Sequence, residues 1–396
     1  MGSRGEILVS KSLCFVASVM MVIQMPLVSV FALELGASTL ELGLVGGLGP
    51  AVYAVIALLA GPLVSRVREP RAITYSLLVM GSSYFMFSLS RSVAELAVVN
   101  MLSTGAYALF WPAVESLLSK KGGSASGFAF SWSLGGLSAS LAVSPLLSAP
   151  KRLVFQVLAA LSLASALTSL TLKGDSGEGN ETIKGILGGI ADIPDAWAGC
   201  LIYATVQGAV FVFYPAFLEL SGLPEMYASL CFFSLIGART LTFLVYPKLG
   251  VRSGESLLSG LIALSLVSLV PHSREVLHLA LTALFVGVGA GLTYTGSLEK
   301  AFYSDEEVRA SYMGLFESFI GWGYAAGPVI AGLVSEYSIY YSFYATGIMA
   351  LATAVLLAVA RVLARLLKKS STIQATVDRD ETISGTAIPT FTDLER

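Results

Sequence analysis

Residues 41–71 read ELGLVGGLGPAVYAVIALLAGPLVSRVREPR, an apolar run that ends abruptly in a basic turn. No charged residue occurs from Leu42 to Val64, a length that exceeds the roughly 20 residues an α-helix needs to cross a bilayer. Arg66, Arg68 and Arg71 follow this run. Because Lys and Arg collect in short cytoplasmic loops, the stretch predicts a membrane-spanning helix whose C-terminal end lies on the cytoplasmic side.

The composition extends this interpretation to the whole chain. Of 396 residues, 55% are hydrophobic and 13% charged, with a mean hydropathy of +0.77, whereas soluble domains are roughly 25% charged. The net charge of −2 leaves no basic face for nucleic acid. The three cysteines lie within apolar runs and are expected to pack as small residues. No nucleotide-binding motif or paired-histidine spacing occurs, so we expect no cofactor, no metal and no self-contained ATP-driven pump.

Twelve apolar runs predict an all-α integral membrane protein. Residues 173–195 are polar and read as a cytoplasmic linker between an N-terminal six-helix bundle (1–172) and a C-terminal six-helix bundle (196–367). Residues 368–396 are rich in Thr and acidic residues and are expected to form a disordered cytoplasmic tail. The predicted spans are 13–34, 42–64, 72–90, 93–118, 124–148, 153–172, 196–220, 227–249, 255–271, 276–298, 309–335 and 340–365.

The basic residues orient these spans. Of the 24 Lys and Arg residues, nineteen fall on the side of the N-terminus, and Arg239 lies inside a span. The opposite side has four: Arg91, Lys151, Arg152 and Arg274. One missed or extra span would move later basic loops to the opposite side and remove this asymmetry. Both termini are therefore expected in the cytoplasm of a multi-pass protein of the cell membrane. We expect a monomer in the bilayer.

The two halves also repeat at a shift of about 184 residues. FALELGAS at 31–38 aligns with AFLELSGL at 216–223, and GAYALFWPAVESLL at 105–118 aligns with GAGLTYTGSLEKAF at 289–302. These matches pair Glu34 with Glu219 and Glu115 with Glu299, while Gln24 and Gln207 are 183 apart. One common shift across six-span halves is typical of a parallel repeat about an axis along the membrane normal.

At this point the chain resembles the major facilitator superfamily of secondary transporters. The likeness rests on LGASTLELGLV at 35–45, GPLVSR at 61–66, WPAVESLLSKKGGSASGFAF at 111–130 and the six-plus-six layout. The resemblance implies two six-helix bundles that transport a small molecule by alternating access. It also implies a cytoplasmic gate at the loop after the second span.

The loop signature of the family is only partly kept. Gly61 and Arg66 match it, but Ser65 replaces the aspartate, and the residues at 68–70 replace a glycine and a basic pair. The acidic partner of the basic turn is therefore lost, and Glu69 is the candidate to substitute for it. The Gly-Pro motif of exporters is absent from the fifth span, whereas Gly327 and Pro328 form such a pair in the eleventh, so export does not follow.

Two charged residues are expected in the transport path. Arg239 lies midway along the eighth span, where a cation must face a cavity or a partner. It is interpreted as a clamp for an anionic group of the substrate, or alternatively as half of a structural ion pair. Glu317, two turns into the eleventh span, is its candidate partner. A carboxylate that alternates between Arg239 and a proton would couple transport to a proton gradient, unless Glu317 faces the cytoplasmic vestibule and stays ionised.

Further candidates are polar or aromatic. Gln24 and Gln207 are mid-span amides that need partners, either a substrate or a neighbouring helix. Glu115 and Glu299 end the fourth and tenth spans and are candidate gate residues, although acidic residues at span ends, Glu34 and Glu219 included, are more often solvated. Aromatic residues lie on the expected cavity helices, and part of this set belongs to interfacial belts: Tyr107, Phe110, Trp111, Tyr203, Tyr214, Tyr294, Trp322 and Tyr324.

The sequence therefore predicts a secondary transporter of a small organic solute, coupled to a cation gradient, with protons expected. Arg239 favours an organic anion or an amino-acid-like solute, whereas the apolar aromatic cavity equally suits amphipathic drug-like compounds. An enzyme is not expected, because the assigned spans contain no Asp for a convergent catalytic set. A membrane sensor without flux stays a second possibility, because the polar tail offers a binding segment for a partner.

Overall fold

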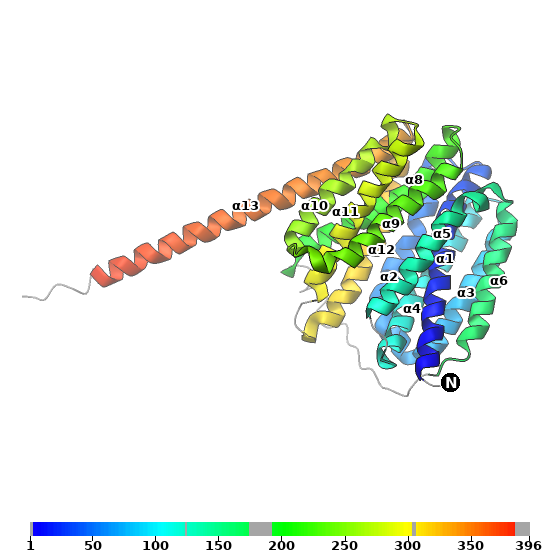
Figure 1. Cartoon of the computed structure of the whole chain (residues 1–396), viewed down its shortest axis with the longest axis horizontal. Coiled ribbons are helices and arrows are strands. Elements are labelled where there is room, and N and C mark those ends of the chain that lie inside the picture. The colour runs from blue at the N-terminus through cyan, green and yellow to red at the C-terminus, as the bar shows by residue number, and fades with distance from the viewer. Residues whose placement is uncertain (1–2, 123–124, 174–191, 303–305, 385–396) are drawn as a thin grey trace, which may run out of the picture. The chain divides into compact units, whose positions relative to one another are not determined.

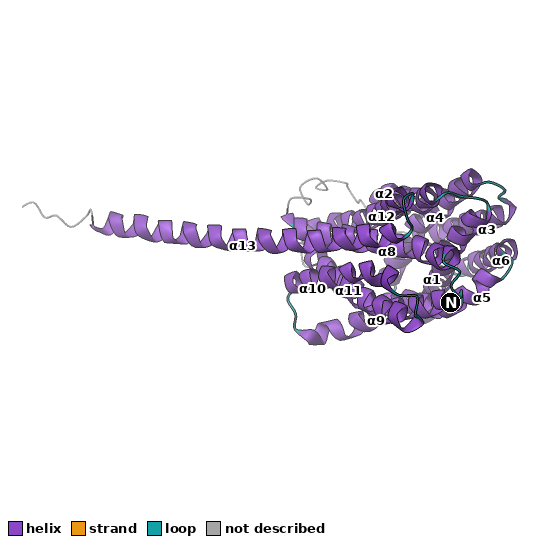
Figure 2. Ribbon diagram, turned by 90° about the horizontal axis from the view of Figure 1, so that it is seen from above, coloured by secondary structure: helices purple, strands orange, loops and turns teal. Residues whose placement is uncertain are grey.

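The computed structural model describes residues 3–122, 125–173, 192–302 and 306–384. Its described residues form helices and loops without strands, as Figure 2 shows, and twelve helices are long and apolar enough to cross a membrane. The chain divides into two compact units, Met1–Thr353 and Ala354–Arg396. The predicted fold class and span count are therefore confirmed.

The first six helices run from the N-terminus to residue 169. They are α1 (Ser3–Glu34), α2 (Thr39–Val67), α3 (Glu69–Leu89), α4 (Val93–Lys120), α5 (Ala125–Ser148) and α6 (Lys151–Ser169). Within this group α2 packs on α4, α1 on α5, and α3 on both α4 and α6. Figure 1 shows them side by side, coloured from blue to green.

The later helices form a second group in the same compact unit, up to residue 353. They are α8 (Pro194–Leu220), α9 (Met226–Leu249), α10 (Ser253–Ser265) with the 3₁₀ helix η1 (Leu266–His272), α11 (Val276–Phe302), α12 (Glu306–Ser335) and α13 (Tyr340–Ser384). α12 packs on α8, and α11 on α9 and α10. The two groups meet through four helix pairs, α2 with α12, α5 with α9, α1 with α8, and α2 with α8.

Helix α2 shows how the local sequence sets its ends. Ser38 precedes it in an extended conformation, and its hydroxyl accepts a hydrogen bond from the amide of Glu41 at 3.2 Å. The Glu41 carboxylate in turn accepts from the Ser38 amide at 2.9 Å, which completes a capping box. At the other end Arg68 has φ +73° and ψ 140°, a region that favours glycine. This is the position where the family signature has its glycine.

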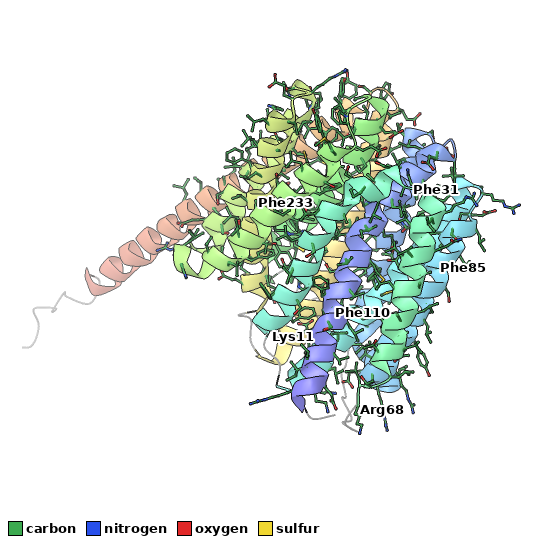
Figure 3. All side chains as sticks on the ribbon, turned by 45° about the vertical axis from the view of Figure 1, so that its right-hand side comes forward. Lys11, Phe31, Arg68, Phe85, Phe110 and Phe233 are labelled. Carbon is green, nitrogen blue, oxygen red and sulfur yellow. The ribbon has the colours of Figure 1, made fainter. Side chains whose placement is uncertain are left out.

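The outer surface of the helices is apolar. Phe85 on α3 and Phe233 on α9 are exposed large hydrophobic side chains, and Figure 3 labels both on the ribbon. A folded protein exposes such side chains widely only where lipid or a partner replaces water. This surface agrees with the membrane class expected from composition.

The chain after the last span differs from the sequence prediction. Helix α13 continues to Ser384, so residues 368–384, expected to be disordered, are helical. The physical reason is that no Gly or Pro interrupts the chain between Gly347 and Gly385, and charged and alkyl helix formers fill much of that interval. Residues 385–396 and most of the expected linker, 174–191, lie outside the described residues.

Candidate functional site

A cavity of about 250 Å³ lies between the two groups of helices. Eight helices line it, α1, α2, α4 and α5 from the first group and α8, α9, α11 and α12 from the second. Most of its lining is apolar or aromatic, with a few polar side chains among them. Such a composition is typical of small-molecule sites.

Glu317 lies in this cavity on α12. Its carboxylate accepts a hydrogen bond of 3.0 Å from the hydroxyl of Tyr53 on α2, so one contact joins the two groups of helices at the cavity wall. Ile320, Gly321 and Tyr324 line the same cavity. These positions follow Glu317 by three, four and seven residues and therefore share one helix face.

Trp322 does not share that face. It points away from the cavity with 46% of its surface exposed, because it lies one residue beyond Gly321 and is rotated by about 100° around the helix. The prediction that Trp322 lines the site is therefore corrected. Trp111 on α4 and Tyr294 on α11 do line the cavity.

Arg239 on α9 is also a cavity residue, and only 6% of it is exposed. Its Nη1 donates to the hydroxyl of Tyr203 at 3.3 Å, and its guanidinium lies 5.7 Å from the ring centroid of Trp132 on α5. Its Nε has no hydrogen-bond partner among the described protein groups. The cation is thus held by aromatic groups, and its buried Nε–H is left without a partner among the described groups.

Arg239 and Glu317 line one cavity but do not pair. No ion pair among the described side chains joins them, and each uses a tyrosine instead. Aromatic residues continue the wall beside them: Tyr203 packs edge-on against Tyr294 at 5.5 Å, and Tyr294 packs against Phe316 at 5.4 Å. The expected direct partnership is therefore absent from this conformation.

The two repeat-related glutamines have different surroundings. Gln24 lines the cavity, but its amide is already bonded to Asn100 (3.0 Å), Tyr84 (2.8 Å) and Ser103 (3.0 Å). Gln207 is fully buried outside the cavity, and neither its amide oxygen nor its nitrogen has a partner among the described groups. Of the two, only Gln24 reaches the cavity surface, and its amide forms hydrogen bonds with side chains of neighbouring helices.

The two expected gate residues Glu115 and Glu299 also differ in their surroundings. Glu115 lines the cavity on α4, whereas its repeat partner Glu299 accepts hydrogen bonds from Tyr246 (3.0 Å) and Ser253 (2.8 Å). Glu34 pairs with Lys151 at 3.0 Å.

Glu69 does not bridge the two groups of helices. It pairs with Lys120 on α4 and accepts from Ser116 at 2.9 Å, so both partners belong to the first group. In this conformation it therefore does not supply the contact across the domain interface that the family signature provides. Gly61, Ser65 and Arg66 lie in α2, but the surroundings of Gly61 and the side chains of Ser65 and Arg66 are outside what the structure describes.

Tyr53, Asn100 and Trp132 are among the cavity residues that were not predicted from the sequence. Asn100 is an uncharged amide in a span, a signal equal to that of Gln24. Tyr53 and Trp132 belong to spans with several large side chains, and without the packing no sequence signal separates the inward-facing ones. Their contacts with Glu317 and Arg239 make them the aromatic supports of both charges.

The cavity is closed at one end by contacts between the groups. At the end opposite the N-terminus, Glu336 accepts from the Thr39 hydroxyl and the Leu40 amide, both at 2.9 Å. The Ser144 amide donates to Ser229 at 2.7 Å in the same region. Towards the N-terminal end, the described hydrogen bonds between the groups include Tyr53–Glu317 and Ser133–Thr240.

A family model, described as Major Facilitator Superfamily, matches residues 12–302. The chain belongs to the Major Facilitator Superfamily. Its twelve membrane helices and central cavity are those of a transporter of this superfamily.

Solved structures share the fold of this superfamily member. The nucleoside transporter NupG is 17% identical with a TM-score of 0.73, covering 89% of this chain and 98% of its own. A bacterial homolog of the human lysosomal transporter Spinster, inward-facing and unoccupied, is 13% identical with a TM-score of 0.71, covering 90% and 95%. A variant of the peptide transporter POT in complex with sulfate is 16% identical with a TM-score of 0.73, covering 91% and 95%.

Proposed function

We propose that this superfamily transporter moves a small organic solute by alternating access and couples that movement to protons through Glu317. The supporting observation is the position of Glu317, a carboxyl group in the central cavity with no cationic partner among the described residues. Ionisable residues within membrane spans mark ion and substrate paths, and carboxyl groups there act as proton carriers.

The Tyr53–Glu317 hydrogen bond connects proton binding to the movement of the helices. It joins α2 to α12, which belong to different groups. When the groups rock, this bond must break or change, so the two conformations hold the carboxyl group in different surroundings. A ligand or proton with unequal affinity for two conformations shifts the population between them.

Arg239 is proposed to bind an anionic group of the substrate. A guanidinium presents parallel N–H donors that match a carboxylate or phosphate, and the Nε of Arg239 has no partner among the residues that the structure describes. A second candidate is the transport of amphipathic compounds. The aromatic wall of Trp111, Tyr203 and Tyr294 favours it.

The basic residues also support an orientation. We infer that the cavity opens at the end that carries the N-terminus and the basic turn at Arg68, labelled in Figure 3, because contacts between the groups close the other end. With cytoplasmic termini in the cell membrane, as proposed from the loop charges, this end of the cavity would face the cytoplasm.

The test is uptake into proteoliposomes under an imposed pH gradient, with a panel of organic anions, amino acids, sugars and lipophilic cations. Gradient-driven accumulation is expected for the wild type and is lost in Glu317→Gln, while exchange of internal for external substrate is kept. Glu255→Gln, which removes an exposed carboxylate on α10, is the matched control.

Accumulation that survives in Glu317→Gln would reject Glu317 as the coupling residue and keep the transporter. Binding of a panel compound without any flux would instead favour a sensor. Unchanged transport of a neutral or cationic compound in Arg239→Gln would favour the amphipathic class over the anion.

A further inference from the structure

We infer that the substrate is a zwitterion, whose cationic group is bound at Glu115 and whose anionic group is bound at Arg239. This inference rests on the proposed transport function and names its substrate class. It follows from how the charges of the cavity are used. None of the three charged side chains that line it has a partner of opposite charge among the described residues. Glu317 accepts a hydrogen bond from Tyr53 and Arg239 donates one to Tyr203, whereas the described residues give the Glu115 carboxylate no hydrogen bond.

The acidic subsite lies on α4. Glu115 follows Trp111 by one helical turn, so both side chains share a helix face, and both line the cavity. The ring of Trp111 packs edge-on against Phe128 of α5 at 6.2 Å. A carboxylate beside an indole is a combination that binds ammonium groups, by charge and by cation–π attraction.

The basic subsite lies on α9. Arg239 is almost fully buried, and Tyr203 and Trp132 hold it by a hydroxyl and a ring face. Neither contact neutralises its charge. Its Nε donor has no partner among the described groups, so the guanidinium keeps an edge for a carboxylate.

A ligand with one charge serves only one of these subsites. A cation leaves the buried charge of Arg239 without compensation, which is costly, and an anion leaves the exposed carboxylate of Glu115 without a partner. A zwitterion compensates both at once. It also contacts α4 of the first group and α9 of the second, so its binding connects the helices that must move together.

The experiment measures ligand binding to the purified full-length protein in detergent, with no membrane or gradient. The probes are two zwitterions, phenylalanine, whose charges are close together, and 6-aminohexanoate, whose charges are far apart. Each zwitterion is compared with its carboxamide, which lacks the negative charge, and with its N-acetyl form, which lacks the positive charge. Trp111 and Trp132 line the cavity, so tryptophan fluorescence reports binding, and a rise in the thermal midpoint confirms it. At least one zwitterion is expected to bind about tenfold more tightly than both of its capped forms.

The variants assign the subsites. In Glu115→Gln, the zwitterion is expected to bind no more tightly than its N-acetyl form, which keeps only the carboxylate. In Arg239→Gln, the zwitterion is expected to bind no more tightly than its carboxamide, which keeps only the ammonium group. Glu255→Gln and Arg252→Gln, which neutralise exposed side chains outside the cavity, are expected to keep both preferences.

A probe panel in which capped forms bind as tightly as the zwitterions would overturn the inference. So would preferences that survive in both cavity variants. Because no gradient is present, either result leaves proton-coupled transport untouched, and failure of coupling in proteoliposomes leaves this binding result untouched.

Discussion

Gln24 and Gln207 occupy equivalent places in the sequence repeat, yet the structure gives them opposite energetic roles. Gln24 is bonded to three side chains on α3 and α4, whereas both amide atoms of Gln207 are buried without a described partner. A buried hydrogen bond stabilises modestly, while an unsatisfied buried polar group costs about 1–3 kcal/mol. The repeat therefore preserves residue type without preserving its contacts.

We expect Gln24→Leu to lower the stability of the protein by about 1–3 kcal/mol, because it leaves Asn100, Tyr84 and Ser103 without their shared partner. Gln207→Leu is expected to be neutral or stabilising, because it removes two unpaired polar atoms. The thermal midpoint in detergent measures both. Gln156→Leu on the exposed face of α6 is the control, and equal losses in the first two variants would contradict this account.

At the scale of elements, the contact between α2 and α12 holds one end of the cavity closed. Glycines allow the two backbones to approach: a Cβ at Gly43 would lie 2.4 Å from the carbonyl oxygen of Pro328 and 3.0 Å from the Cα of Gly332. A side chain at position 43 therefore cannot be accommodated without separating the helices. Small residues at helix crossings are typical of membrane bundles.

Gly43→Ala is accordingly expected to lower the population of the conformation in which this end of the cavity is closed, and to reduce transport. The shift is measured as a longer distance between spin labels on Arg91→Cys and Arg274→Cys, since both positions are exposed and the native cysteines are buried. Gly237→Ala is the matched control, because a Cβ there meets only Leu137 at 3.6 Å. An unchanged label distance together with normal transport would show that the α2–α12 contact does not control the gate.

At the scale of the whole molecule, the orientation in the membrane depends on charge and not on packing. Nineteen of the 24 basic residues lie on the side of the N-terminus in the twelve-span arrangement, and the structure has twelve helices able to span. Short loops rich in Lys and Arg stay in the cytoplasm. The orientation that we propose therefore places the N-terminal end of the cavity on the cytoplasmic side.

Reporter fusions test this orientation. A fluorescent protein fused after Arg396 is expected to fluoresce in a bacterial host, and alkaline phosphatase at the same place is expected to be inactive. Alkaline phosphatase fused after Arg152, on the opposite side, is expected to be active. The reverse pattern would place the termini outside and make the open end face outward.

The sequence alone determined the membrane class, the span count and the family, because hydropathy, loop charge and short motifs are properties of consecutive residues. It also located Arg239, Glu317, Trp111, Tyr294 and Glu115, since charged or bulky groups inside spans stand out in an apolar chain. Only the tertiary structure decided which neighbours these side chains contact. The tyrosine partners of Arg239 and Glu317, the outward turn of Trp322 and the isolation of Gln207 all depend on which helix faces meet. Helix rotation and neighbour choice are set by packing between segments far apart in the chain, and no local pattern encodes them.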